Sequence, residues 1–169
     1  ANPPPVKYCI ENWLRDEQIK LSIVRCKDRV QEVETPRTEP IALVSYGPSL
    51  HDTWAQIKDY RYVMSCSGAH RFLIERGIVP TWHLAVDPLP KNTPALIGTP
   101  HRDVEYLIAS TCHQDVFDHL EGYTVKLWHV FDADADAYRM LPQNEWALTG
   151  GCSVGVRMLT MARFLGFTD

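Results

Sequence analysis

The chain has 169 residues, of which 45% are hydrophobic and 22% charged, and its formal net charge is -4. This length and composition are typical of one soluble globular domain. The acidic balance supplies no basic surface that would attract nucleic acid regardless of sequence, so we expect no nucleic-acid partner. Because no apolar run approaches the roughly 18 residues that span a bilayer, we expect no membrane segment either.

The five cysteines are widely spaced and include no C-x-x-C pair, the spacing that would suggest zinc binding or thiol exchange. The start "ANPPPVKYC" lacks the apolar core of a signal peptide. Both observations predict a cytoplasmic protein.

Residues 1–40 are predicted to form an N-terminal part distinct from the domain that follows. Prolines at positions 3 to 5 favour a short extended lead, because proline fixes φ and lacks a backbone donor. Between residues 7 and 33, apolar side chains recur at roughly helical spacing, although Glu17 interrupts the stripe. The pattern predicts one or two amphipathic helices that end at the linker "ETPRTEP" and could contact a protein partner or a second copy.

Residues 41–169 alternate between β-type and helical segments. The β-type runs are "IALVS", "YRYVMSC", "TWHLAVD", "VEYLIAS" and "YTVKLWHV". Strands interleaved with helices favour βαβ units. The sequence therefore predicts an α/β, Rossmann-like domain with a mainly parallel sheet and helices on both faces.

The segment "GGCSVGVRMLTMARFLGFTD" places apolar side chains along one face of a final helix. A crossover helix returns the chain to the sheet. We therefore expect a further strand after this helix, and a domain that is incomplete at its C-terminal end.

Small and hydrogen-bonding residues follow the predicted strands, and ligands of open α/β sheets bind beyond the carboxyl ends of the strands. The first group is Ser45, Tyr46, Gly47, Pro48 and Ser49. Gly47 allows a close backbone approach, and Ser49 can cap the next helix or donate to an anion. A plain strand-to-helix turn, capped by Ser49, is the alternative.

Two further groups have the same character. Ser67 and Gly68 follow the second strand, and Gly150, Gly151 and Ser153 precede the final helix. Free N–H groups at such a helix start can hold a phosphate or carboxylate. A flexible loop with a capping serine is the alternative for the latter group.

Asp87 ends the third predicted strand, where a carboxylate can hold Mg²⁺ while substrate phosphates complete the coordination shell. A turn aspartate before Pro88 is the alternative. His113 and His129 stand near strand ends and are candidate acid/base groups. The run Asp132, Asp134 and Asp136 lacks the glycine and glutamate of a calcium loop, and it is interpreted as a solvated acidic loop.

Three ordered blocks carry a family resemblance: "YGPSL", "GAHRFLIERGIVPTWHLAVDP" and "TGGCSVGVRMLTMARFLGF". They resemble the 6-hydroxymethylpterin diphosphokinase MptE-like family, which includes the central domain of motility accessory factors. The first and last blocks are also similar to bacterial sialyltransferases that use CMP-sialic acid. Family members usually read G-N-G-P-S-L, so Gly47 to Leu50 match, whereas Ser45 and Tyr46 replace the glycine and the asparagine.

The resemblance implies a transferase that moves diphosphate from ATP to a small hydroxymethyl acceptor, with Mg²⁺. Asp87 would then be the metal-binding acidic residue, and the glycine-serine loops would hold the nucleotide. A glycosyltransferase that uses a CMP-activated acidic sugar is the second hypothesis. A non-catalytic binding or assembly module on the same fold is the third, because fold does not fix function.

Overall fold

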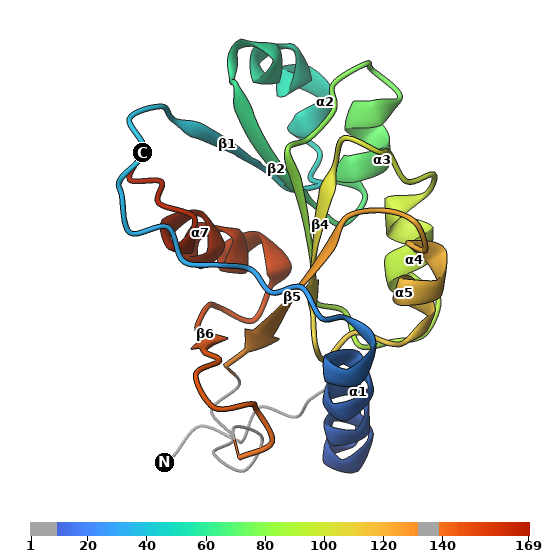
Figure 1. Cartoon of the computed structure of the whole chain (residues 1–169). Coiled ribbons are helices and arrows are strands. Elements are labelled where there is room, and N and C mark those ends of the chain that lie inside the picture. The colour runs from blue at the N-terminus through green and yellow to red at the C-terminus, as the bar shows by residue number, and fades with distance from the viewer. Residues whose placement is uncertain (1–9, 132–138) are drawn as a thin grey trace, which may run out of the picture.

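The structure, a computed structural model, describes residues 10–131 and 139–169 (Figure 1). The predicted N-terminal lead and the acidic run at Asp132, Asp134 and Asp136 lie outside the described residues. Within these ranges no helix is both long enough and apolar enough to cross a membrane.

A six-stranded sheet runs through the described part of the chain, and its strands are all parallel and follow chain order. They are β1 (Ile41–Val44), β2 (Tyr62–Cys66), β3 (Trp82–Ala85), β4 (Glu105–Ala109), β5 (Val125–Val130) and β6 (Ala147–Leu148). The first five coincide with the five predicted runs, so the predicted α/β class with a parallel sheet is confirmed. The two-residue β6 was not predicted, because two residues carry no alternating pattern.

The connecting helices cover one face of the sheet (Figure 1). They are α2 (Leu50–Thr53), the 3₁₀ helix η1 (Trp54–Asp59), α3 (Ala69–Ile74), α4 (Asn92–Ile97) and α5 (Asp115–His119). This sidedness follows from the strand order, because right-handed crossovers between successive neighbouring strands all leave their helices on the same face.

The opposite face is covered by α7 (Val154–Phe164), which contacts β1, β2 and β3 (Figure 1). Its apolar residues Met158, Met161 and Ala162 are buried in the main core. Helices therefore lie on both faces, as predicted.

The N-terminal part contains one helix, α1 (Asn12–Arg25), followed by an extended segment. The Val33 N–H donates to the Phe164 carbonyl (2.9 Å), and Arg29 forms a parallel bridge with Leu127 of β5. The predicted alternative of a second helix is therefore wrong, because the backbone after α1 bonds to β5 and to the end of α7 instead of to itself.

The chain after α7 turns back along the start of β1. Gly166 has φ +89° and accepts a hydrogen bond from the Arg37 N–H (2.8 Å), and the Ile41 N–H donates to the Asp169 carbonyl (3.2 Å). An added Cβ at Gly166 would lie 2.9 Å from Val33, so the turn requires glycine. Residues 167–169 thus run beside the segment that leads into β1, and the further strand expected after α7 stays a prediction.

Candidate functional site

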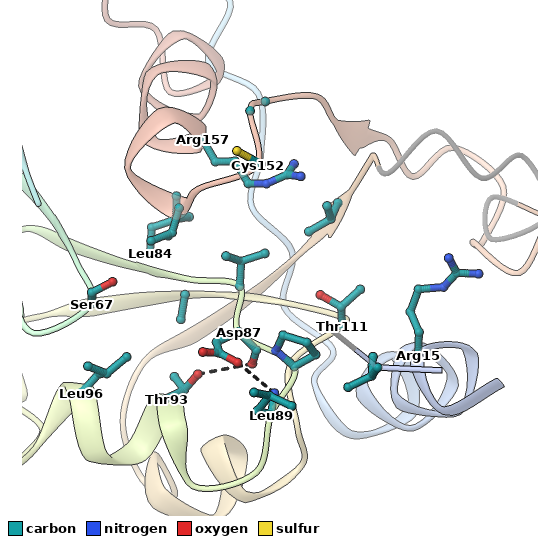
Figure 2. A pocket seen from close by; sticks show the side chains of 18 of the residues that line it. Arg15, Ser67, Leu84, Asp87, Leu89, Thr93, Leu96, Thr111, Cys152 and Arg157 are labelled. Atoms are coloured by element: carbon teal, nitrogen blue, oxygen red, sulfur yellow. Dashed lines mark hydrogen bonds between the residues drawn. The ribbon is translucent and has the colours of Figure 1, made fainter. Parts of the chain in front are cut away.

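A cavity of about 810 Å³ lies at the carboxyl ends of the central strands, between the loop after β3 and the start of α7 (Figure 2). Its polar lining residues come from five separate parts of the chain: Arg15, Ser67, His83, Asp87, Thr93, Thr111, Cys152 and Arg157. Gly150 and Gly151 also line it, together with apolar residues of β3 and β5. Four of the candidate site residues from the sequence, Ser67, Asp87, Gly150 and Gly151, thus line this cavity.

The second glycine loop, residues 150–153, forms one wall of this cavity and leads into α7. Ser153 caps the helix, since its Oγ accepts a hydrogen bond from the Val156 N–H (3.4 Å). The first N–H groups of a helix lack intrahelical partners and carry a partial positive charge. The start of α7 therefore gives this wall an electropositive character.

Packing explains why this loop contains two glycines. A Cβ at Gly150 would lie 2.7 Å from Cγ of Arg157, and one at Gly151 would lie 2.9 Å from Cγ1 of Val156. Both distances are shorter than real Cβ contacts, so a side chain at either position would push the loop away from the first turn of α7.

Asp87 stands across the cavity from α7 and is held by its own turn (Figure 2). Its Oδ1 accepts a hydrogen bond from the Leu89 N–H (2.9 Å), and its Oδ2 accepts one from the Asn92 amide (3.2 Å). This is the turn aspartate that the sequence left open as the alternative. The carboxylate lines the cavity all the same, with lone pairs remaining on both oxygens.

The donor set around Asp87 limits how a magnesium ion could be held. Among the described residues, no three His, Cys, Asp or Glu side chains are grouped to hold a metal ion. Mg²⁺ in nucleotide sites usually keeps several waters and takes one or two carboxylates besides the phosphates. Asp87 therefore fits as a single ligand to an ion that arrives with its nucleotide.

The first glycine loop, residues 45–49, lies outside the cavity lining. The Ser49 carbonyl accepts hydrogen bonds from the N–H groups of Asp52 and Thr53 (both 3.1 Å), and the Ser49 side chain makes no capping bond. The helix that follows, α2, has four residues. Gly47 and Pro48 thus belong to a turn whose carbonyl groups accept hydrogen bonds from the backbone N–H groups of the next few residues.

Two contacts tie this first loop to its neighbours. The Tyr46 ring lies over Gly68, where an added Cβ would be 3.2 Å from Cγ of Tyr46. The Ser45 Oγ lies 3.3 Å from Sγ of Cys66, and only 2.7 Å from an ideal Cβ on Gly155 in the first turn of α7. Tyr46, which stands where the family has asparagine, is therefore a packing residue between the loops after β1 and β2.

His113 lies beyond Thr111 and Cys112, at the start of α5, and does not line the cavity. Its Nδ1 is 3.1 Å from Oδ1 of Asp115 and accepts the Asp115 N–H (3.3 Å). His129 is buried, with Nδ1 2.9 Å from Ser110 Oγ and Nε2 2.5 Å from Glu145 Oε2. The structure therefore brings neither histidine to the cavity wall.

Comparison with known proteins adds a family to this geometry. The sequence profile of the family described as 6-hydroxymethylpterin diphosphokinase MptE-like matches residues 18–169. The chain belongs to this MptE-like family. A solved structure, the Maf glycosyltransferase from Magnetospirillum magneticum AMB-1, superposes with a TM-score of 0.71 over 91% of this chain, at 24% sequence identity.

The superposed region makes up 26% of the Maf glycosyltransferase chain, so this MptE-like chain spans about a quarter of that protein. At this identity the likeness shows the shared fold. No curated protein matches the sequence closely enough to serve as a relative. The fold of the MptE-like chain is thus transferase-like, in agreement with the resemblance that the three sequence blocks carry.

Sequence reasoning missed three basic residues of the MptE-like cavity: Arg15, His83 and Arg157. His83 is a polar residue inside an apolar strand, and its Nδ1 lies 3.0 Å from Ser65 Oγ. Burial, together with the charge of nearby His70, lowers the pKa of His83 well below 6.5. Arg157 follows the second glycine loop by one helical turn, and this spacing could have indicated that its side chain lies near the loop.

Arg15 is the third missed residue, and it reaches the cavity from α1. The buried face of α1 is polar and consists of Arg15, Gln18 and Ser22, with Ile19 beside them. Gln18 donates to the Pro88 carbonyl (3.3 Å). The spacing of Arg15, Gln18 and Ser22 places them on one helical face, so the sequence contained a signal for a polar buried face. The prediction of an amphipathic helix rested instead on the apolar residues of α1.

Proposed function

We propose that this domain is a nucleotide-dependent transferase that moves diphosphate from ATP to a small hydroxymethyl acceptor. One observation carries the proposal: Ser67, Asp87, Gly150 and Gly151, predicted from three separate segments, surround one cavity at the carboxyl edge of the sheet. Membership of the MptE-like family, residues 18–169, supplies the reaction class.

In the proposed reaction, the acceptor hydroxyl attacks the β-phosphorus of ATP, the bond between the α,β-bridging oxygen and the β-phosphorus breaks, and AMP leaves as the β- and γ-phosphates pass to the acceptor. The hydroxyl proton leaves to solvent. The start of α7 and the second glycine loop would hold the phosphates. Bound Mg²⁺ would neutralise the charge of the transferring group, with Asp87 as its protein ligand. Catalysis of this kind rests mainly on positioning and charge neutralisation.

The test is AMP formation from ATP and 6-hydroxymethylpterin in the presence of Mg²⁺. We expect acceptor-dependent AMP from the wild-type protein and a loss of about a hundredfold in kcat/KM for Asp87→Asn, typical of removing one transition-state charge contact. Asp103→Asn, at an exposed aspartate remote from the cavity lining, is the matched control. Undiminished activity of Asp87→Asn would remove the metal-binding role.

A second candidate is a glycosyltransferase that uses a CMP-activated acidic sugar. The fold shared with the Maf glycosyltransferase favours it, as do two arginines in the cavity lining, Arg15 and Arg157, which suit an acidic sugar. Thermal-shift measurements with CMP and CTP against ATP and GTP separate the two candidates. Selective stabilisation by cytidine nucleotides would favour sugar transfer.

A third candidate is a non-catalytic binding or assembly module. Tyr46 favours it, because this residue turns a nucleotide loop of the family into a packing contact. So does α1, which exposes Trp13, Leu21 and Val24 and could present them to a protein partner or a second copy. Failure of every nucleotide to raise the melting temperature, with or without Mg²⁺, would make this candidate the leading one.

A further inference from the structure

Arg157 carries an unsatisfied cationic group at the edge of the cavity. The residue lies one turn into α7 and lines the cavity, and its Nη1 is shielded from solvent yet has no hydrogen-bond partner among the residues that the structure describes. None of the ion pairs formed among the described residues includes Arg157. A buried donor without a partner is costly, and a charged one more so.

The surroundings fix Arg157 in this place. Its Cγ and Cα lie so close to Gly150 that an added Cβ there would be 2.7 Å and 3.2 Å from them. The second glycine loop therefore packs directly against the aliphatic part of the Arg157 side chain. Figure 2 shows Arg157 beside Cys152 on one side of the cavity, with Asp87 and Thr93 on the other side.

The acidic group that faces the cavity does not pair with Arg157. Asp87 directs its two oxygens to the Leu89 N–H and the Asn92 amide, within its own turn. The cavity thus has a cationic wall and, opposite it, a carboxylate wall. A ligand that satisfies both would place an anionic group at Arg157 and hydroxyl groups, or a cation, at Asp87.

We propose that the Arg157 guanidinium binds a phosphate group of the substrate directly, so that this end of the ligand is held without a metal ion. The inference rests on the proposed nucleotide-dependent function and names the residue that holds the phosphate. A guanidinium presents its N–H groups in a planar fork that matches two oxygens of a phosphate. Its neighbours at the start of α7 add a partial positive charge.

This role differs from a structural one in its effect on stability. An arginine that held the fold together would lower the melting temperature when replaced. An arginine kept for a ligand can be replaced by an uncharged side chain of similar length at no cost, because the shielded Nη1, which lacks a partner among the described residues, is removed with it. Arg157→Met is therefore expected to melt at or above the wild-type temperature.

The experiment measures binding of ATP and of inorganic tripolyphosphate by calorimetry, each with EDTA and with Mg²⁺, together with melting temperatures. We expect wild-type protein to bind both ligands in EDTA, and Arg157→Met to bind both about tenfold to a hundredfold more weakly. Arg157→Lys keeps the charge but not the fork, so it should recover part of the affinity. Arg163→Met, at an exposed arginine in the last turn of α7, should bind as the wild type does.

Equal affinity of Arg157→Met and wild type would overturn the inference, as would wild-type binding that occurs only with Mg²⁺. A melting temperature of Arg157→Met well below that of Arg163→Met would show a structural role and overturn it as well. Absence of any nucleotide or tripolyphosphate binding by the wild type is a different result, since it removes the proposed function itself.

Discussion

The two glycine loops contain the same residue types but do different things. The first, residues 45–49, closes on itself, starts a helix of four residues and lies outside the cavity lining. The second, residues 150–153, lines the cavity and starts a helix of eleven residues. A glycine followed two residues later by a serine therefore marks the junction with a helix in both loops, but only the second junction lines the cavity.

Neighbouring contacts account for the difference. In the first loop, Tyr46 covers Gly68, and Gly47 has no atom within 4 Å of an added Cβ. In the second loop, both glycines are pressed against the first turn of α7 by Arg157 and Val156. The first loop is thus held by the packing of the Tyr46 side chain on Gly68. The second loop can approach α7 closely because Gly150 and Gly151 have no side chains.

Acid should destabilise the domain that carries both loops and produce the largest effect. His70 and His83 are buried, and burial lowers the pKa of each. The Nδ1–H of His70 donates to the Ile97 carbonyl (2.8 Å), and its Nε2 accepts a hydrogen bond from the Tyr106 hydroxyl (2.9 Å). Protonation of Nε2 would break this second hydrogen bond.

Both folded-state pKa values lie below the unfolded one, so the stabilisation is complete above about pH 6.5 and is lost as the pH falls below it. We expect each histidine to cost up to ~1.4 kcal/mol of unfolding free energy per pH unit. Urea unfolding between pH 5 and 8 checks this. His83→Gln should flatten the profile, and His51→Gln, at an exposed histidine, should not. A profile flat below pH 6.5 in the wild type would contradict the prediction.

Gly150→Ala should distort the second loop alone. The added methyl group overlaps Cγ of Arg157, and overpacking of this kind costs about 1–3 kcal/mol. Nucleotide affinity should fall about tenfold or more, because the guanidinium and the start of α7 are displaced together. Denaturant unfolding and calorimetric titration measure the two effects, and a variant with wild-type values in both would show that the loop adapts freely.

Glu145→Gln should weaken the contacts of the segment that precedes β6 and the second loop. The Glu145 Oε2 accepts hydrogen bonds from Nε of Arg29 (2.7 Å) and Nε2 of His129 (2.5 Å). Burial raises the pKa of Glu145, but these two partners outweigh it and hold the pKa below its usual range. Removing the charge should cost roughly 1–2 kcal/mol, since the pair is partly exposed.

Glu121→Gln, at an exposed glutamate after α5, is the control for Glu145→Gln. Unfolding in urea at pH 7 should separate the two variants. If they are equally stable, the contact among Arg29, His129 and Glu145 does not contribute to the stability of the fold.

Gly47→Ala should have the smallest effect. Gly47 has no atom within 4 Å of an added Cβ and no positive φ, so alanine fits without strain. The change in unfolding free energy should stay within about 0.5 kcal/mol, and nucleotide affinity should be unchanged. A tenfold loss of affinity without loss of stability would break the contrast between the loops, because it would place a ligand at the first one.

The sequence predicted five strands and the site edge because their signals are local. Short apolar runs of β-type residues define the strands, and the rule of parallel strand ends placed Ser67 and Asp87 at one edge. The extended segment 26–40 escaped prediction, because its partners are the β5 edge and the end of α7, more than a hundred residues away in the case of Phe164. Arg15 escaped for a similar reason.

The sequence by itself determined the element types and the sheet edge at which to look for a ligand site, since these depend on residue periodicity and on where parallel strands end. Only the tertiary structure decided which glycine loop meets the cavity, because that depends on how α7 packs across β1, β2 and β3. It also decided that Tyr46 packs on Gly68 and that Arg157 keeps an unpaired donor beside the cavity. Both outcomes depend on side-chain contacts between distant segments, which no local pattern encodes.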